Sequence, residues 1–137
     1  MTRNIAGTSL QRSLLCIVCI LMLTVFGCQR RITEVIAGEN IPIPENMTKN
    51  PDKAMEPIPG LEDGQVSYQG KVTPAEIFTF YQEVMEAKGW QPTARFADKK
   101  DRIAYTKGNR LVLIRYEEMP NGPTILTILV GRQDLPK

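Results

Sequence analysis

The chain has 137 residues, which is enough for one ordinary domain and no more. Its formal charge is +2, and it contains no histidine and only three cysteines. A charge this small does not favour nucleic-acid binding, and the lack of histidine excludes the common histidine-based catalytic and metal sites.

The first segment, residues 1–27, has the three-part pattern of an export signal. A basic start without acidic residues is followed by the apolar run 14–26 and then by Gly27. A transmembrane helix needs about 20 apolar residues to cross a bilayer, and this run has 13. A permanent membrane helix is therefore the weaker alternative, and an ordinary secretory signal with a chance cysteine is another.

The end of this segment resembles a lipobox. In Val25-Phe26-Gly27-Cys28 a hydrophobic triplet precedes a cysteine, as in bacterial lipoproteins, although a smaller residue is commoner at the position of Phe26. The resemblance implies that Cys28 is acylated with lipid such as palmitate, and that residues 1–27 are removed as a signal peptide. It also implies anchoring on the periplasmic side, with Gln29 favouring the outer over the inner membrane.

Removal of the signal would change the charge and the thiol content. Loss of Arg3 and Arg12 would leave 15 basic and 15 acidic side chains, so we expect no nucleic-acid partner. Cys16 and Cys19 would leave with the signal, and Cys28 would carry lipid. The exported domain would then have no disulfide and would depend on its apolar core.

The next segment, residues 28–56, is predicted to be a lipid-anchored, proline-rich tether. No helical or alternating apolar period runs through residues 29–64, because prolines interrupt the segment. There are five of them: Pro42, Pro44, Pro51, Pro57 and Pro59.

Residues 57–132 are predicted to form the folded domain, and residues 133–137 a tail. Residues 65–72 alternate between apolar and polar, as a half-buried strand does. Thr73-Pro-Ala-Glu76 is a capping box with proline at the first helical position, which starts a helix that runs to about Lys88. Gly89 ends the helix, and in the closing Schellman turn Trp90 would pack against the last turn of the helix.

The remaining residues indicate a short series of strands. Turn residues separate four runs of strand-forming residues: 93–97, 102–106, 110–117 and 124–130. The predicted fold class is α+β, with one helix packed on a 4–5-stranded, mainly antiparallel sheet in the order β-α-β-β-β-β.

The globular part resembles an uncharacterised domain of exported bacterial lipoproteins. The residues that carry the resemblance are Pro57-Ile-Pro-Gly60, Tyr68-Gln-Gly70, Phe80-Tyr81, Met85 and Gly89-Trp90. That family implies no activity, cofactor or catalytic residue.

The residue types also argue against catalysis. Ser67 is the single serine after residue 27, and no histidine is present to activate it, so we predict no catalytic residue, no metal site and no cofactor. The predicted function is a non-enzymatic, membrane-tethered binding or assembly module of the cell envelope. The alternative is a small periplasmic hydrolase in which two of four carboxylates converge: Glu62, Asp63, Glu76 and Glu117.

One face of the predicted sheet is too apolar to be left in water. Val112, Ile114 and Tyr116 should face the helix, which leaves an aliphatic patch on the opposite side. The proline-rich segment around residues 41–61 could fold back over this patch, or an envelope protein or a second copy of the domain could dock there. The patch consists of Leu111, Leu113, Ile125 and Leu129.

Overall fold

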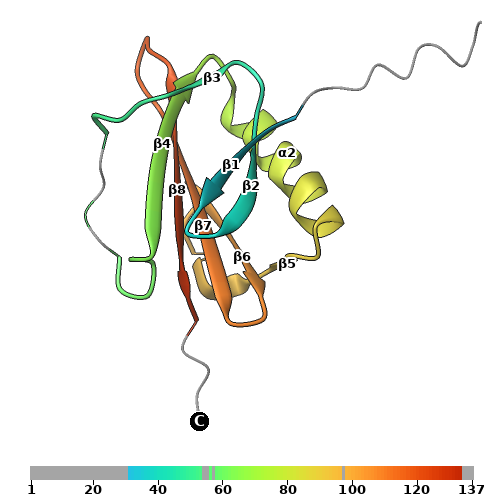
Figure 1. Cartoon of the computed structure of the whole chain (residues 1–137). Coiled ribbons are helices and arrows are strands. Elements are labelled where there is room, and N and C mark those ends of the chain that lie inside the picture. Colours follow the sequence, from blue (N-terminus) through green and yellow to red (C-terminus); the bar gives the residue numbers. More distant parts are fainter. Residues whose placement is uncertain (1–30, 54–55, 57, 97, 134–137) are drawn as a thin grey trace, which may run out of the picture. The chain divides into compact units, whose positions relative to one another are not determined.

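The computed structural model describes residues 31–53, 56, 58–96 and 98–133. These residues form an α+β domain with one six-stranded antiparallel sheet and one separate two-stranded sheet (Figure 1). The strands of the large sheet, in their spatial order, are β3 (Met47–Lys49), β4 (Gly64–Gly70), β8 (Thr124–Arg132), β7 (Arg110–Glu118), β6 (Arg102–Lys107) and β5 (Gln91–Pro92). The small sheet is the hairpin of β1 (Ile32–Ile36) and β2 (Glu39–Ile43).

The helix α2 (Pro74–Ala87) begins and ends as its sequence predicts. Glu76 N–H donates to Thr73 Oγ1 at 3.3 Å, and Thr73 N–H donates to the Glu76 carboxylate at 2.7 Å, which completes the capping box. At the other end Gly89 has a φ of +81°, and Trp90 N–H donates to Met85 O at 3.0 Å. This Schellman closure places Trp90 in the core, where its side chain is 3 % exposed.

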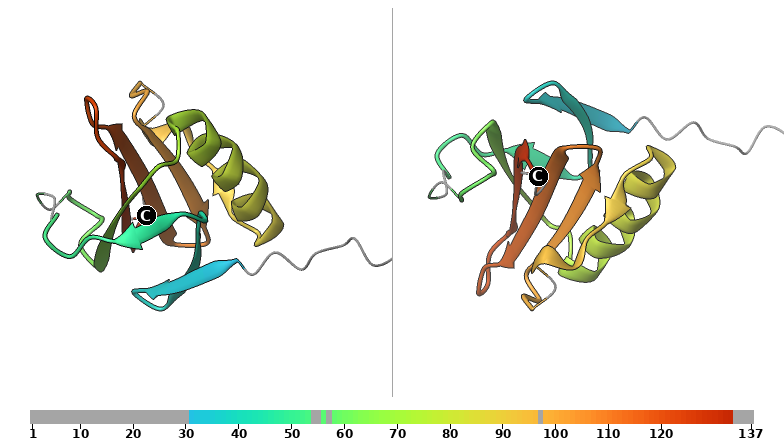
Figure 2. Two further views of the ribbon diagram at one scale, coloured as in Figure 1. Left: turned by 90° about the horizontal axis from the view of Figure 1, so that it is seen from above. Right: turned by 90° about the horizontal axis from the view of Figure 1, so that it is seen from below.

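The main core lies between the large sheet and a layer made of α2 and the β1–β2 hairpin (Figure 2). As predicted, the helix-facing side chains of β7 and β8 are in this core, which also contains Ile77 and Tyr81 from α2. The Tyr81 hydroxyl donates to Pro42 O at 3.0 Å and so joins the helix to the hairpin. The strand residues are Val112, Ile114, Tyr116, Leu126, Ile128 and Val130.

The number of strands and the extent of the tether differ from the prediction. Eight strands in two sheets replace the predicted four or five, because residues 32–49 of the predicted tether form β1, β2 and β3. Ile41 and Ile43 alternate with prolines and are fully buried. Pro42 is tolerated in β2 because its backbone faces outward from the two-stranded sheet. Its carbonyl accepts from Tyr81, and since N–H and C=O of one strand residue point to the same side, the missing N–H breaks no bond to β1.

The strand predicted at residues 93–97 is also wrong. Pairing of β5 with β6 is limited to Gln91 and Pro92, and residues Ala94–Phe96 form the 3-10 turn η2. After this turn, Asp101 accepts hydrogen bonds from Arg102 at 2.9 and 3.1 Å and from Arg115 at 3.2 Å. Arg102 holds the pKa of Asp101 below its ordinary value, so the carboxylate remains charged and fixes the chain as it enters β6.

Replacement of Trp90 by alanine should lower the free energy of unfolding by about 3–5 kcal/mol, because it removes a large buried side chain from the core. Phe80 is only partly buried, so Phe80→Ala should cost less, about 1–2 kcal/mol. Phe78→Ala is the matched control, since Phe78 is 42 % exposed. Urea unfolding measures the free energy of unfolding of all three variants. Equal losses of this free energy in Trp90→Ala and Phe78→Ala would contradict the core assignment.

Alkaline pH should destabilise the domain through its four tyrosines, Tyr68, Tyr81, Tyr105 and Tyr116. Burial raises the pKa of each, and that of Tyr105 to about 12. Since the folded-state pKa exceeds the unfolded value of about 10, the stabilisation is complete below pH 10 and is lost as pH rises toward 12. Phenolate absorbance should therefore rise only together with unfolding. If these tyrosines titrated near pH 10 while the protein was still folded, that result would contradict this expectation.

Candidate functional site

The predicted lipidation site, Cys28, lies outside the described residues, and the structure begins three positions later, at Arg31. Among the residues that are described, no helix is both long and apolar enough to cross a membrane.

The predicted partner patch is covered within the chain. Leu111 and Leu113 are fully buried, Leu129 is 1 % exposed and Ile125 is 7 % exposed. Leu61 belongs to the same buried cluster, and Ile58 and Phe96 pack against it. Residues 58–61 and η2 therefore supply a fold-back cover for Leu111, Leu113 and Leu129. Ile125 lies outside this cluster and lines a small hollow with Lys53, Arg115, Glu117 and Thr127.

Three of the four carboxylates of the alternative hydrolase have local structural roles, and the fourth, Glu62, is exposed. Glu76 completes the cap of α2, and Asp63 pairs with Arg110 at 2.7 Å. Glu117 lies 3.9 Å from Arg115 at the end of β7. In the part of the chain that the structure describes, no group of three or more acidic, cysteine or histidine side chains is arranged to hold a metal ion.

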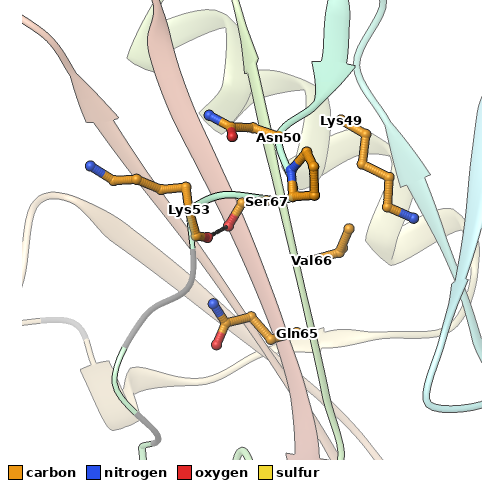
Figure 3. Close-up of a pocket in the computed structure, with 7 residues that line it drawn as sticks. Lys49, Asn50, Lys53, Gln65, Val66 and Ser67 are labelled. Atoms are coloured by element: carbon orange, nitrogen blue, oxygen red, sulfur yellow. Dashed lines mark hydrogen bonds between the residues drawn. The ribbon is translucent and has the colours of Figure 1, made fainter.

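A hollow of about 370 Å³ lies beside β4, where the chain leaves β3. Figure 3 shows Lys49, Asn50 and Lys53 from the departing chain, and Gln65, Val66 and Ser67 from β4. Along β4 the side chains of Gln65 and Ser67 point to one face, and that of Val66 points to the other, as alternation in a strand requires. The hollow therefore straddles the edge of the sheet. Its lining residues are Lys49, Asn50, Pro51, Lys53, Gln65, Val66 and Ser67.

The hollow exists because β3 is much shorter than β4. β3 pairs only with the last three residues of β4, and one further hydrogen bond joins Asn50 N–H to Ser67 O at 2.8 Å. Backbone groups of alternate strand residues point to the same side, so those of Gln65 face this edge as those of Ser67 do. No backbone hydrogen bond from another described residue reaches Gln65 on that side.

Buried polar contacts hold the wall of the hollow in place. The Ser67 hydroxyl donates to Lys53 O at 2.7 Å and lies 3.1 Å from Thr127 Oγ1 on β8. Ser67 and Thr127 are 4 % and 3 % exposed, so these contacts are protected from water. They join the departing chain to the sheet at the point where β3 pairing has ended.

The two lysines of the hollow are in different electrostatic states. Lys49 pairs with Glu34 of β1 at 2.5 Å, and this hydrogen bond lowers the pKa of Glu34. Lys53 is exposed, and its side chain points away from Lys49 (Figure 3). Lys53 and the amides of Asn50 and Gln65 can bind a polar or anionic group. Among the described lining residues, Ser67 has the one hydroxyl, and no histidine or carboxylate is present to activate it.

Sequence reasoning missed this hollow. Ser67 was considered only as a nucleophile, and Lys53 fell in the predicted tether. The available signal was the pair Ile41 and Ile43, which alternate with prolines as apolar residues do in an edge strand, but no comparable pattern indicates the short strand β3.

A family model described as START domain-like matches residues 51–123, which is more than half of the chain. The match extends from the loop after β3 to the turn before β8 and includes Lys53 and Ser67 of the hollow but not Lys49. No curated protein and no solved structure matches the chain at a significant level. The chain belongs to the START domain-like family.

Proposed function

We propose that this protein is a lipid-anchored, non-enzymatic binding module of the bacterial cell envelope. The observation that carries the proposal is the lipobox-like Val25-Phe26-Gly27-Cys28 immediately upstream of a folded domain that starts at Ile32. Acylation at Cys28 would attach the domain to the periplasmic side of a membrane, and Gln29 favours the outer membrane. Stable attachment requires more than one acyl chain, which lipoprotein processing supplies.

Because β1 starts at Ile32, a lipid anchor at Cys28 would hold the domain close to the membrane surface. Only Gln29, Arg30 and Arg31 separate Cys28 from Ile32, so the two Cα atoms lie at most about 14 Å apart. The flexible tether predicted for residues 28–56 would let the domain range far from the bilayer, whereas this spacing keeps β1 at the lipid headgroups. Arg30 and Arg31 would add attraction to anionic lipids.

The binding role rests on the family and on the hollow beside β4. Membership in the START domain-like family supports a ligand-binding module. The backbone edge at Gln65, which no backbone hydrogen bond of another described residue reaches, suits an extended polar segment of an envelope partner, which would add a strand to the sheet. Lys53 would favour an acidic side chain in that segment.

Cys28→Ala should abolish lipid attachment and leave unprocessed precursor, because the thiol is the nucleophile that receives the lipid. Metabolic labelling with a fatty acid, followed by gel analysis, measures both effects. Cys16→Ala and Cys19→Ala are matched controls, because both thiols precede the proposed cleavage point and should leave labelling unchanged. Label retained in the Cys28→Ala protein would refute the anchor.

Gln65→Pro should prevent strand addition at the edge of β4, because proline removes the N–H of Gln65, which donates to no other described residue of the chain. Gln65→Ala keeps this N–H and is the matched control. We expect photocrosslinks in intact cells to be lost with Gln65→Pro and retained with Gln65→Ala, while urea unfolding changes little for either. Equal crosslinking by both variants would rule out pairing at this edge.

A further inference from the structure

The strand β1 has a backbone edge without a partner in the described part of the chain. Pro42 of β2 lies opposite Thr33, has no N–H and directs its carbonyl to Tyr81, so this pair forms no hydrogen bond within the hairpin. The N–H and C=O of Thr33 therefore point away from β2, and those of Val35, two residues on, point the same way. Among the described residues, no backbone hydrogen bond from outside the hairpin reaches either of them.

This edge is open to solvent. Thr33 is exposed, and Val35 is 66 % exposed. Figure 2 shows β1 at the margin of the domain, on the side of the hairpin that lies away from α2. Ile32 and Val35 are two of the three large hydrophobic side chains that are exposed in the described part of the chain. β1 contains neither the proline nor the lysine that protects many edge strands from pairing.

The sequence of β1, Ile32-Thr-Glu-Val-Ile36, complements itself in the antiparallel direction. With Glu34 at the centre, each Thr33 lies opposite Val35 of the second copy, and each Ile32 lies opposite Ile36 of the second copy. These are pairs of β-branched residues, which pack well across antiparallel strands. A contact between two identical surfaces requires this property, because each residue must fit its counterpart across a two-fold axis. The strand of an unrelated partner would not require it.

Alternation along β1 agrees with pairing at the edge. Ile36 is 5 % exposed and Glu34 binds Lys49 of β3, so the even-numbered side chains face the large sheet, whereas Val35 faces outward. Ile32 and Val35 thus lie on opposite faces of β1, and an added strand contacts both faces at once. Like charges directly opposite each other destabilise a sheet, but each of the two Glu34 carboxylates has its own cation in Lys49.

We infer that two copies of this protein pair through β1 and form a four-stranded antiparallel sheet in the order β2–β1–β1–β2. Each Thr33 exchanges backbone hydrogen bonds with Val35 of the other copy. So small an interface is weak between freely diffusing molecules. The inference therefore rests on the proposed lipid anchor, which confines the copies to one surface and raises their effective concentration. Each Cys28 lies within about 14 Å of its own Ile32, so both anchors can reach the same membrane.

Disulfide trapping of the full chain in intact cells, under mild oxidation, tests the pairing and its register. The two copies of residue 34 form a non-hydrogen-bonded pair with Cα atoms about 4.5 Å apart, which is within the range of a disulfide. Glu34→Cys should therefore give a disulfide-linked dimer on a non-reducing gel. Thr33→Cys is the matched control, because its two copies lie about 8–9 Å apart and should give at least about tenfold less dimer. The unsubstituted chain, in which lipid blocks Cys28, should give none.

A second substitution in the Glu34→Cys chain tests the backbone contact. Val35→Pro should abolish the dimer, because it removes an N–H that donates only to the second copy, and Val35→Ala keeps this N–H and should retain the dimer. Urea unfolding verifies that each variant is folded.

Fatty-acid label on the same gel reports the anchor separately. A dimer without label would refute the anchor alone, whereas a monomeric Glu34→Cys protein, labelled or unlabelled, would overturn the inference. Equal amounts of dimer from Glu34→Cys and Thr33→Cys would overturn it too, because trapping would then reflect random collisions. A disulfide from Glu34→Cys to a different envelope protein, in place of the dimer, would assign the edge to that protein and would also overturn the inference.

Discussion

The fold depends on one constraint, which is that β7 and β8 are apolar on both of their faces. Val112 and Ile114 face α2, while Leu111 and Leu113 face the opposite side, and all four are fully buried. One helix of 14 residues covers only part of one face. Burial of the rest requires further segments, and each aliphatic side chain removed from water contributes about 1.5–3 kcal/mol.

The covering segments come from the part of the chain that looks least regular in sequence. The β1–β2 hairpin lies beside α2 and completes the cover of the main core, fixed by the hydrogen bond from Tyr81 to Pro42. On the other face, Ile58 and Leu61 pack with Phe96 over the second cluster. Prolines in these segments reduce the conformational entropy that the chain loses on ordering.

The candidate site at Gln65 results from the way in which the covering segments enter and leave the sheet. The hollow forms because the chain departs after Lys49, and among the described residues no second strand pairs with residues 64–66 of β4. This site depends on no residue motif, so it could be recognised only after the loops had been placed. Cys28 is the opposite case, because its proposed chemistry is indicated by four consecutive residues.

The sequence alone determined the elements whose signals are local. The capping box at Thr73, the stop at Gly89 and the alternation along β7 and β8 each lie within a few residues, and they identified α2, its boundaries and the side of the sheet that it covers. Only the tertiary structure decided that the proline-rich segment forms three strands, that residues 94–96 turn instead of pairing, and which segment covers the leucines. These outcomes depend on contacts between residues far apart in the chain, and a short strand becomes favourable only when a distant face is present to bury it.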